Sequence, residues 1–525
     1  MKNILIVSSP GATKIKDQSF FINPVNWNLK SYHQKKGLSK HDYHWLEPEL
    51  LTTYSPFDSN LNFLLNLIDT KNISILGFSS YTWDSQHFFS LAKEIKKKYP
   101  NILIAIGGPE IDVHVNSNFF DDLQEIDCAF YGEAEIAFTR FLDYLSGYDV
   151  ELVNLATKDK LYEHQIFNDK EFLRESPLSG YLDEYEIYWK KLKKKFPDKK
   201  LIAVWETVKG CPFACSFCDW QSGLHNKVRI WAKNSTKPSW QKELDLFTKL
   251  EVPEIFWTNP NLGLHKQDYE IVDYWCELAK QNLNPPKNNS PQISKINLES
   301  AIALMTKQYD LGICESFKFD IQCTNETVLA NIDRPATPWP EFKKVLQKLI
   351  RDYPNLGSFR GKPKINLIWP LPGQNLDILK YSMSEIGSLG MYAEVYPWQL
   401  LPLSPAAKKE YQEKFKLKIK KGDFFESNPG IAKYVVETYS ASEKEVFIGF
   451  FISQLYRSFY LAEFNVVGKE HLFFDNISKI QPLLDSSYKY WKNNNKLRIG
   501  FDNSVFTFEK FVEKLGKMFY KKIVA

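Results

Sequence analysis

The chain of 525 residues carries little net charge, because 67 Lys and Arg side chains are balanced by 63 Asp and Glu side chains to leave +4. A nucleic-acid-binding domain usually presents a strongly basic face, so this balance argues against nucleic acid as a partner. No internal repeat or low-complexity segment is evident. Hydrophobic residues make up 44% and charged residues 25% of the chain, a globular composition, and its length predicts about three domains.

The sequence also lacks a disulfide framework and a targeting segment. Its cysteines number seven, an odd count, and four of them stand singly within apolar stretches, as buried reduced thiols do. The opening MKNILIVSS lacks the long apolar core and the small-residue cleavage site of a signal peptide. The most apolar run, residues 446–464, is interrupted by polar and charged residues, which favours a buried helix over a membrane span. We therefore expect a cytoplasmic protein without a membrane partner.

The remaining three cysteines, Cys211, Cys215 and Cys218, stand together in GCPFACSFCDW with the spacing Cys-x3-Cys-x2-Cys. Iron–sulfur clusters are normally held by four thiolates, so a compact set of three implies that a substrate or cofactor completes the coordination. The alternative is a closed zinc site in which His225 adds the fourth ligand. Zinc motifs usually consist of two separated ligand pairs, and this one does not. The spacing favours a cluster with one open iron.

This motif resembles that of the radical S-adenosylmethionine (SAM) superfamily. The resemblance implies a [4Fe-4S] cluster whose open iron is chelated by the amino and carboxylate groups of SAM, and whose electron cleaves SAM to a 5′-deoxyadenosyl radical. Gly210 and Pro212 shape the loop. Phe217 stands where the family's aromatic residue lies against the adenine, so the resemblance makes it a cofactor-binding residue.

Residues 1–150 alternate β-rich runs with helical patterns, which predicts a doubly wound parallel sheet. The strand candidates are 4–9, 73–80, 102–108 and 128–133, and helical spacing marks 61–68 and 88–95. Ligands of such sheets lie beyond the carboxyl ends of the strands, which places three loops, 77–84, 107–110 and 131–135, around one crevice. The candidate binding residues of these loops are Ser79, Ser80, Tyr81, Gly107, Gly108, Glu110, Gly132 and Glu133.

A sheet of this type ahead of a radical SAM motif resembles the cobalamin-binding domain of the cobalamin-dependent radical SAM enzymes. The resemblance implies that the three loops surround the corrin and its nucleotide tail. Many cobalamin domains supply a histidine to cobalt from Asp-x-His-x-x-Gly after the first strand, but SSPGATKIKDQ contains none, and the Asp-x-His pairs at 42–44 and 112–114 are expected at the surface. Cobalamin would then bind without a histidine ligand. The alternative is a flavodoxin-like domain that binds nothing.

Residues 151–198 are expected to be a connector, and the basic run 190–200 at its end a solvated helix face. Residues 199–405 repeat the alternation and predict a partial βα-barrel, with strand and loop segments at 201–207, 254–263, 316–334, 364–374 and 392–405. Loops at the carboxyl face of barrel strands carry the chemistry, so the residues expected to face the cluster and SAM are Asn259, Asn261, Gln322, Arg334 and the loop 371–374.

These segments resemble the radical SAM pattern in the glutamine, the later arginine and the Leu-Pro-Gly-Gln turn. One position departs, since relatives often show Asp-x-Asn-Phe-Gly where this chain has Asn259-Pro-Asn261-Leu-Gly263. A neutral amide cannot act as a base. Residues 406–525 show helical spacing at 431–439 and 451–464 and are expected to form a mainly helical domain, either a cap over the barrel mouth or plain core packing.

The resemblance implies a cobalamin-dependent radical SAM enzyme, a methyltransferase that acts on an unactivated carbon of a small molecule or peptide. Such an enzyme needs an electron donor such as a flavodoxin or ferredoxin. Two alternatives stay open: a radical SAM epimerase or rearrangement enzyme without methyl transfer, and a non-catalytic, zinc-stabilised binding protein. The sequence does not identify the substrate.

Overall fold

The computed structural model divides into two compact units, which are described separately. The first comprises residues 1–212, 219–259 and 269–289, and the second residues 213–218, 260–268 and 290–525. The four-part division expected from the sequence stays a prediction. The residues that the structure describes are 1–11, 19–53, 55–81, 84–109, 111, 119–167, 172–173, 175–220, 228–231, 237–289, 291–314, 318–356, 363–421, 433–462 and short stretches between 473 and 489.

The first unit contains a seven-stranded sheet of order β3-β1-β5-β6-β7-β8, with β4 also pairing with β1. All its pairings are parallel except that of β8 with β7. The strands are β1 (Lys2–Ser8), β3 (Tyr43–Trp45), β4 (Glu49–Leu50), β5 (Ile73–Ser79), β6 (Leu103–Gly107), β7 (Cys128–Phe130) and β8 (Leu155–Thr157). The predicted parallel sheet is confirmed.

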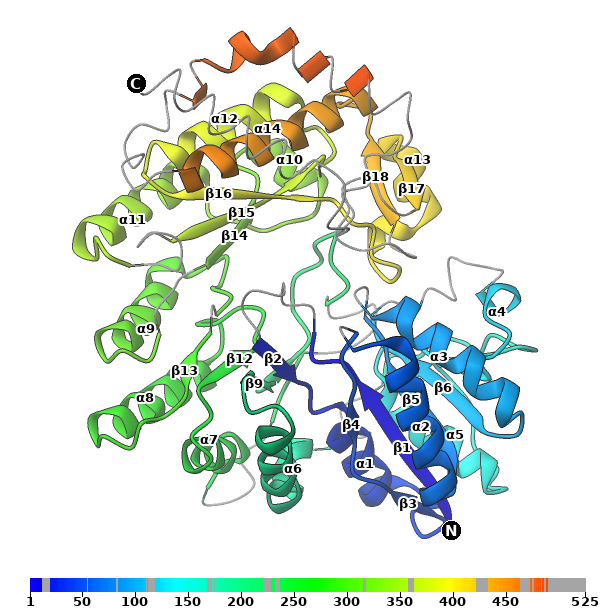
Figure 1. Cartoon of the computed structure of the whole chain (residues 1–525). Coiled ribbons are helices and arrows are strands. Elements are labelled where there is room, and N and C mark those ends of the chain that lie inside the picture. Colours follow the sequence, from blue (N-terminus) through cyan, green and yellow to red (C-terminus); the bar gives the residue numbers. More distant parts are fainter. Residues whose placement is uncertain are drawn as a thin grey trace. The chain divides into compact units, whose positions relative to one another are not determined.

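Helices α1 (Val25–Lys36), α2 (Phe57–Lys71), α3 (Ser85–Lys98), α4 (Phe119–Asp122) and α5 (Ala134–Leu145) accompany this sheet (Figure 1). Ile4 and Ile6 of β1 share one buried cluster with Leu29 of α1 and Phe138 of α5. Residues 4–8 of β1 are all buried, as expected for a parallel strand covered on both faces. This explains why β1 reads as a continuous apolar run rather than an alternating one.

A second sheet of the first unit has the order β13-β12-β9-β2 and is entirely parallel. Its strands are β2 (Ser19–Ile22), β9 (Lys200–Trp205), β12 (Glu254–Trp257) and β13 (Lys287–Asn288). Figure 1 shows the dark blue β2 beside the green β9. The strand β2 was not predicted, and it joins the first 150 residues to the sheet that delivers the cysteine loop.

The second sheet is accompanied by the 3-10 helix η1 (Pro177–Gly180) and by α6 (Leu182–Lys195), α7 (Ser239–Lys249) and α8 (Lys266–Lys280). Trp205 of β9 packs against Trp257 of β12 and Trp275 of α8, with ring centroids 5.5 and 5.9 Å apart. All three indoles are fully buried. Large aromatic side chains contribute much of the buried apolar area, so this cluster forms the centre of the second sheet's core.

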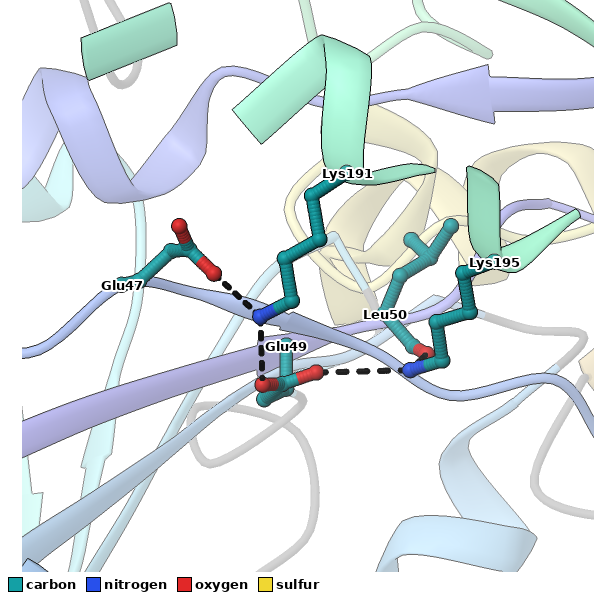
Figure 2. A network of polar contacts seen from close by, with 5 residues as sticks. All are labelled: Glu47, Glu49, Leu50, Lys191 and Lys195. Atoms are coloured by element: carbon teal, nitrogen blue, oxygen red, sulfur yellow. Dashed lines mark hydrogen bonds and ion pairs between the residues drawn. The ribbon is translucent and has the colours of Figure 1, made fainter. Parts of the chain in front are cut away.

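Helix α6 carries the basic run that was expected to be a solvated face. Figure 2 shows that two of its lysines point to acidic side chains instead. Lys191 Nζ contacts Glu47 and lies 3.2 Å from one oxygen of Glu49, while Lys195 Nζ lies 3.4 Å from the other. Glu49 in β4 is only 8% exposed, so its charge requires these partners. The run is solvated at Lys193 and Lys194, while Lys191 and Lys195 tie α6 to the segment that contains β4.

The second unit is built on the parallel sheet β14-β15-β16. Its elements are β14 (Lys318–Gln322), β15 (Lys364–Trp369), β16 (Tyr392–Pro397), the antiparallel pair β17 (Lys418–Lys421) and β18 (Lys433–Glu437), the 3-10 helices η2 (Pro405–Ala407) and η3 (Ile477–Ile480), and helices α9 (Leu298–Asp310), α10 (Glu326–Asn331), α11 (Trp339–Asp352), α12 (Leu376–Gly387), α13 (Lys409–Phe415) and α14 (Glu443–Ala462). Asn325 and Asn375 cap α10 and α12 by accepting hydrogen bonds from Val328 and Ile378.

Helix α14 covers β15 and β16. Trp369 at the end of β15 donates a hydrogen bond of 2.9 Å from Nε1 to the carbonyl of Val446. Gly449, one turn further along, allows this approach, since a Cβ there would lie 2.7 Å from Trp369 Nε1. The apolar run from residue 446 thus lies in a buried helix, as predicted. Among the described residues, we find no helix with the length and apolar character that spanning a membrane requires.

The predicted helix at 431–439 is wrong. Residues 433–437 form β18, which pairs antiparallel with β17. Its central residues, Tyr434, Val435 and Val436, are all buried. Aromatic and β-branched side chains favour strands, and a short apolar run cannot be assigned to helix or strand from its spacing alone.

Candidate cofactor site

The cysteine segment 213–218 is built into the second unit by its backbone. The Ser216 amide donates to the carbonyl of Ile332 at 2.9 Å, and the Ser216 carbonyl accepts from the Ala406 amide at 2.9 Å. The Cys218 amide donates to the carbonyl of Cys215, which closes a tight turn between the two cysteines. Cys215 is 2% exposed and Cys218 is half-buried. This segment is therefore held between the end of α10 and the start of the C-terminal region.

Arg334 lies beside this turn, and its predicted role toward the cluster and SAM stays a prediction. Its Nη1 is 3.9 Å from Cys215 Sγ, and its Nη2 donates to the backbone carbonyl of Asp320 in β14. The guanidinium also lies 5.7 Å from the centre of the Phe217 ring. Arg334 is 5% exposed, so a fixed positive charge stands next to a cysteine sulfur in a buried position.

Gln322 ends β14 in a left-handed conformation, with φ of +70°, which is uncommon for a residue other than glycine. Its side chain is 7% exposed, and Oε1 has no hydrogen-bond partner among the described residues. A buried polar atom without a partner costs free energy, so this oxygen is a candidate to receive a hydrogen bond from a bound ligand. Its neighbour Asp320 accepts a hydrogen bond of 2.6 Å from Asn366. A cavity of about 30 Å³, lined in part by Asp320 and Arg334, has room for about one water molecule.

The two predicted asparagines fall in different units. Asn259 belongs to the first unit and Asn261 to the second, and both are almost fully buried. The turn that follows is fixed by backbone contacts: the Leu262 amide donates to the carbonyl of Gln292, and the Gly263 amide donates to Asp268 Oδ2 at 2.9 Å. The role of the two asparagines as cofactor contacts stays a prediction.

In the predicted loop 371–374, the Gln374 side chain and the Gly373 amide hydrogen-bond to other protein groups. Gln374 Oε1 accepts from the Leu371 amide at 3.0 Å, and its Nε2 contacts Cys323 Sγ at 3.7 Å. The Gly373 amide donates to Ser440 Oγ at 2.9 Å. Since the Gln374 side chain is fully buried and both ends of its amide are engaged, it shapes this turn.

In the first unit, the predicted residues at the ends of β5 and β6 do come together. The Ser80 amide donates to the Gly107 carbonyl at 2.7 Å, and Gly108 (φ +130°) leaves no space for a Cβ, which would lie 2.0 Å from the Ser80 carbonyl oxygen. Ser80 Oγ is buried without a hydrogen-bond partner in the described part of the chain. Tyr81 Oη accepts from Asn23 at 2.8 Å. Gly132 also has positive φ.

Ser79, Ser80, Gly107 and Gly108 thus form a close-packed edge without bulky side chains, which suits the approach of a large flat ligand. Glu110, predicted for the same edge, lies outside the described residues. Binding at this edge stays a prediction.

Glu133 has a protein partner that the sequence did not reveal. Both of its oxygens accept from Arg229, Nη1 to Oε2 at 2.8 Å and Nη2 to Oε1 at 2.7 Å. The neighbouring Glu135 contacts Lys209. Burial would raise the pKa of Glu135, but Lys209 outweighs that effect and holds the pKa below its ordinary value. Burial raises the pKa of Glu206, close to the same lysine, and Lys209 offsets only part of this rise.

Cys211 belongs to the first unit, and Cys215 and Cys218 belong to the second. No group of three or more His, Cys, Asp or Glu side chains able to hold a metal ion occurs among the described residues. Ligands of a four-iron cluster bind different irons, so their thiols need not converge on one point. His225, the fourth ligand of the zinc alternative, lies outside the described residues. His44 is exposed, as predicted for the first Asp-x-His pair.

The fold is similar to that of one solved enzyme, OxsB. The solved structure of OxsB, described as a cobalamin-dependent S-adenosylmethionine radical enzyme with aqua-cobalamin and S-adenosylmethionine bound, covers 100% of this chain and is itself covered to 80%, with a TM-score of 0.59 and 12% identity. The mixed α/β fold predicted from the sequence is thereby confirmed. No family model matches the chain.

Two curated relatives agree with the resemblance found from the cysteine motif. The cobalamin-dependent radical SAM methyltransferase TokK of Streptomyces tokunonensis is 24% identical over 375 residues, which are 70% of this chain and 52% of the relative. The 2-(S-pantetheinyl)-carbapenam-3-carboxylate methyltransferase of Streptantibioticus cattleyicolor is 24% identical over 344 residues, 63% of this chain and 47% of the relative. The chain thus spans about half the length of these relatives.

The C-terminal region supports the cysteine turn through Tyr411 of α13. Its hydroxyl lies 2.8 Å from Ser216 Oγ and donates to the Asn331 carbonyl at 3.0 Å, and burial raises the pKa of Tyr411 to about 12. We expect Tyr411→Phe to lower the free energy of unfolding by about 1 to 2 kcal/mol, because it leaves partly buried polar groups unpaired. It should also speed iron loss from the reconstituted protein, measured by a chelator assay. Unchanged stability and iron retention would show that the contact is incidental.

Proposed function

We propose that this chain is a cobalamin-dependent radical SAM enzyme, and specifically a C-methyltransferase that acts on an unactivated carbon of a small molecule or a peptide. The observation that carries the proposal is the Cys-x3-Cys-x2-Cys loop in a chain whose fold matches OxsB along its whole length. The methyl-transfer part is supported by the names of the two curated relatives, both methyltransferases. Neither alternative, the epimerase or the zinc-binding protein, receives such support.

The residues fit the cofactors that this function requires. Cys211, Cys215 and Cys218 would hold the iron–sulfur cluster through soft thiolates. The edge around Ser80 and Gly108 would accept cobalamin, because the Ser80 Oγ hydroxyl has no hydrogen-bond partner among the described residues and could donate to the ligand. When bound, the cluster supplies the electron that generates a radical from SAM, and cobalamin supplies the methyl group.

Within the second unit, three side chains would contribute to binding these cofactors. Arg334 would place a positive charge beside one cluster ligand, Cys215, while its other nitrogen donates to the Asp320 carbonyl. Gln322 offers Oε1 to a hydroxyl or amino group of a bound nucleoside. Phe217 provides an aromatic face for a base, steadied by Arg334.

The test is anaerobic purification and reconstitution of the full chain, followed by assays of iron, sulfide and zinc and by titration with hydroxocobalamin. With SAM and a reductant such as flavodoxin or dithionite, the enzyme should release 5′-deoxyadenosine and, with cobalamin bound, S-adenosylhomocysteine, the by-product of methyl donation. Release of 5′-deoxyadenosine alone would favour the epimerase or rearrangement reading. Zinc without iron and sulfide would reject both enzymatic readings.

A further inference from the structure

Two short strands of the first unit flank the cysteine loop. Strand β10 (Val208–Lys209) ends two residues before Cys211, and β11 (Arg229–Ile230) follows the loop. They pair antiparallel, with Val208 opposite Ile230 and Lys209 opposite Arg229. The Cys211 amide donates to the Trp220 carbonyl at 2.9 Å, so the two ends of the cysteine loop are also joined at this point. The ribbon and this hydrogen bond form the base of the cysteine loop.

The ribbon places two cations directly opposite each other. Like charges at facing positions of neighbouring strands repel, and Arg229 is only 9% exposed, so this arrangement is unfavourable without counter-charges. The counter-charges come from Glu133 and Glu135, between β7 and the first turn of α5. Glu133 pairs with Arg229 in a bidentate fork, the geometry that fixes orientation as well as distance.

The guanidinium has a further constraint. The Arg229 carbon Cζ lies 3.4 Å from the centre of the Phe172 ring, and Phe172 belongs to a buried cluster that includes Ile136 of α5. Arg229 is thus held by a carboxylate fork and by an aromatic face. Glu133 follows directly on Gly132 and Glu135 comes two residues later, at the carboxyl edge of the first sheet where the cobalamin candidates Ser80 and Gly108 also lie.

We propose that Glu133, Glu135, Lys209 and Arg229 form an edge clamp, a set of positioning residues that fixes the base of the cysteine loop on the carboxyl edge of the first sheet. The edge clamp would hold Cys211 at a fixed position relative to the strand ends around Ser80 and Gly108, where cobalamin is proposed to bind. This inference rests on the proposed function. It assigns Glu133 a positioning role in place of the direct cofactor contact that the sequence suggested. The clamp uses both carboxylate oxygens of Glu133, which is the observation that favours this reading.

The first readout uses the protein without cofactors. In hydrogen–deuterium exchange, Arg229→Gln and Glu133→Gln should speed amide exchange at Lys209, Cys211 and Ile230 by about tenfold or more, since tenfold corresponds to only about 1.4 kcal/mol of local opening. Exchange in β14 and β15 should stay as in the wild type. The matched control is Glu184→Gln, which breaks a more exposed ion pair with Lys30 in the same unit and should leave the ribbon unchanged.

If a glutamine variant fails to fold, Arg229→Lys still tests the edge clamp, because lysine keeps the positive charge but cannot form the bidentate pair with Glu133. It should speed ribbon exchange by a smaller factor of about three to ten, in line with losing one of two hydrogen bonds. Local exchange equal to the wild type in the folded variants would overturn the edge clamp.

The second readout uses the reconstituted enzyme. Arg229→Lys should keep release of 5′-deoxyadenosine while the ratio of S-adenosylhomocysteine to 5′-deoxyadenosine falls about tenfold, as expected for a misplacement of the two cofactors. A merely structural role would lower both products together. If the wild type itself shows neither cluster nor SAM cleavage, the proposed function fails, whereas the exchange result still reports on the clamp.

Discussion

Cys215→Ala should leave the reconstituted protein without inorganic sulfide and without release of 5′-deoxyadenosine from SAM. Three thiolates are already one fewer than a cluster normally has, so removal of one leaves only two protein ligands. Of the two motif cysteines in the second unit, Cys215 is the more buried, at 2% exposure and beside Arg334. The measurement is iron and sulfide per chain after anaerobic reconstitution, together with chromatography of the SAM products.

The matched control is Cys323→Ala in the same unit. Cys323 is as buried as Cys215, but its sulfur contacts Ser382 and Gln374, and burial raises the pKa of this thiol, which disfavours the thiolate form that a metal prefers. This variant should keep the full iron and sulfide content. Retention of SAM cleavage by Cys215→Ala, or equal loss of iron from both variants, would contradict the assignment of the cluster ligands.

The elements predicted well from the sequence are those with strong local signals. β1, β5 and β6 are continuous apolar runs bounded by turn residues, and the helices between them repeat apolar residues at helical spacing. Strand β2 was not predicted, because Ser19–Ile22 is only four residues long and its hydrogen-bond partner β9 lies about 180 residues further along the chain. Strand β18 was predicted as a helix, because its short apolar run is compatible with either helix or strand.

The candidate site divides in the same way. The cysteine spacing is local and could be read directly. The partnership of Glu133 with Arg229 joins residues 96 positions apart, and nothing in the local sequence of either residue indicates the other. The left-handed conformation of Gln322 and the contact of Tyr411 with Ser216 likewise arise from packing between distant segments. Sequence therefore predicts which residues carry chemistry better than it predicts which residues hold them in place.

A buried carboxyl group gives a second test with a large expected effect. Glu243 of α7 is 1% exposed and accepts a hydrogen bond of 2.7 Å from Trp205 Nε1, at the aromatic core of the second sheet. Burial raises the pKa of Glu243 from 4.5 to about 7, and hydrogen bonds from Ser176 and Trp205 offset only part of the rise. Between these two values the folded protein holds a proton that the unfolded chain has released.

The contribution of Glu243 to the free energy of unfolding should therefore be most favourable below pH 4.5 and should decrease as the pH rises toward 7. The shift corresponds to about 3 kcal/mol. Glu243→Gln stays neutral and still accepts the Trp205 hydrogen bond, so it should unfold at a higher temperature than the wild type at pH 8 but not at pH 4.5.

Glu186→Gln on α6 is the control, because its lysine partners lower the pKa of Glu186 and its titration lies below this window. Thermal unfolding followed by circular dichroism at the two pH values checks the prediction, and a stability difference between Glu243→Gln and the wild type that does not change with pH would contradict it.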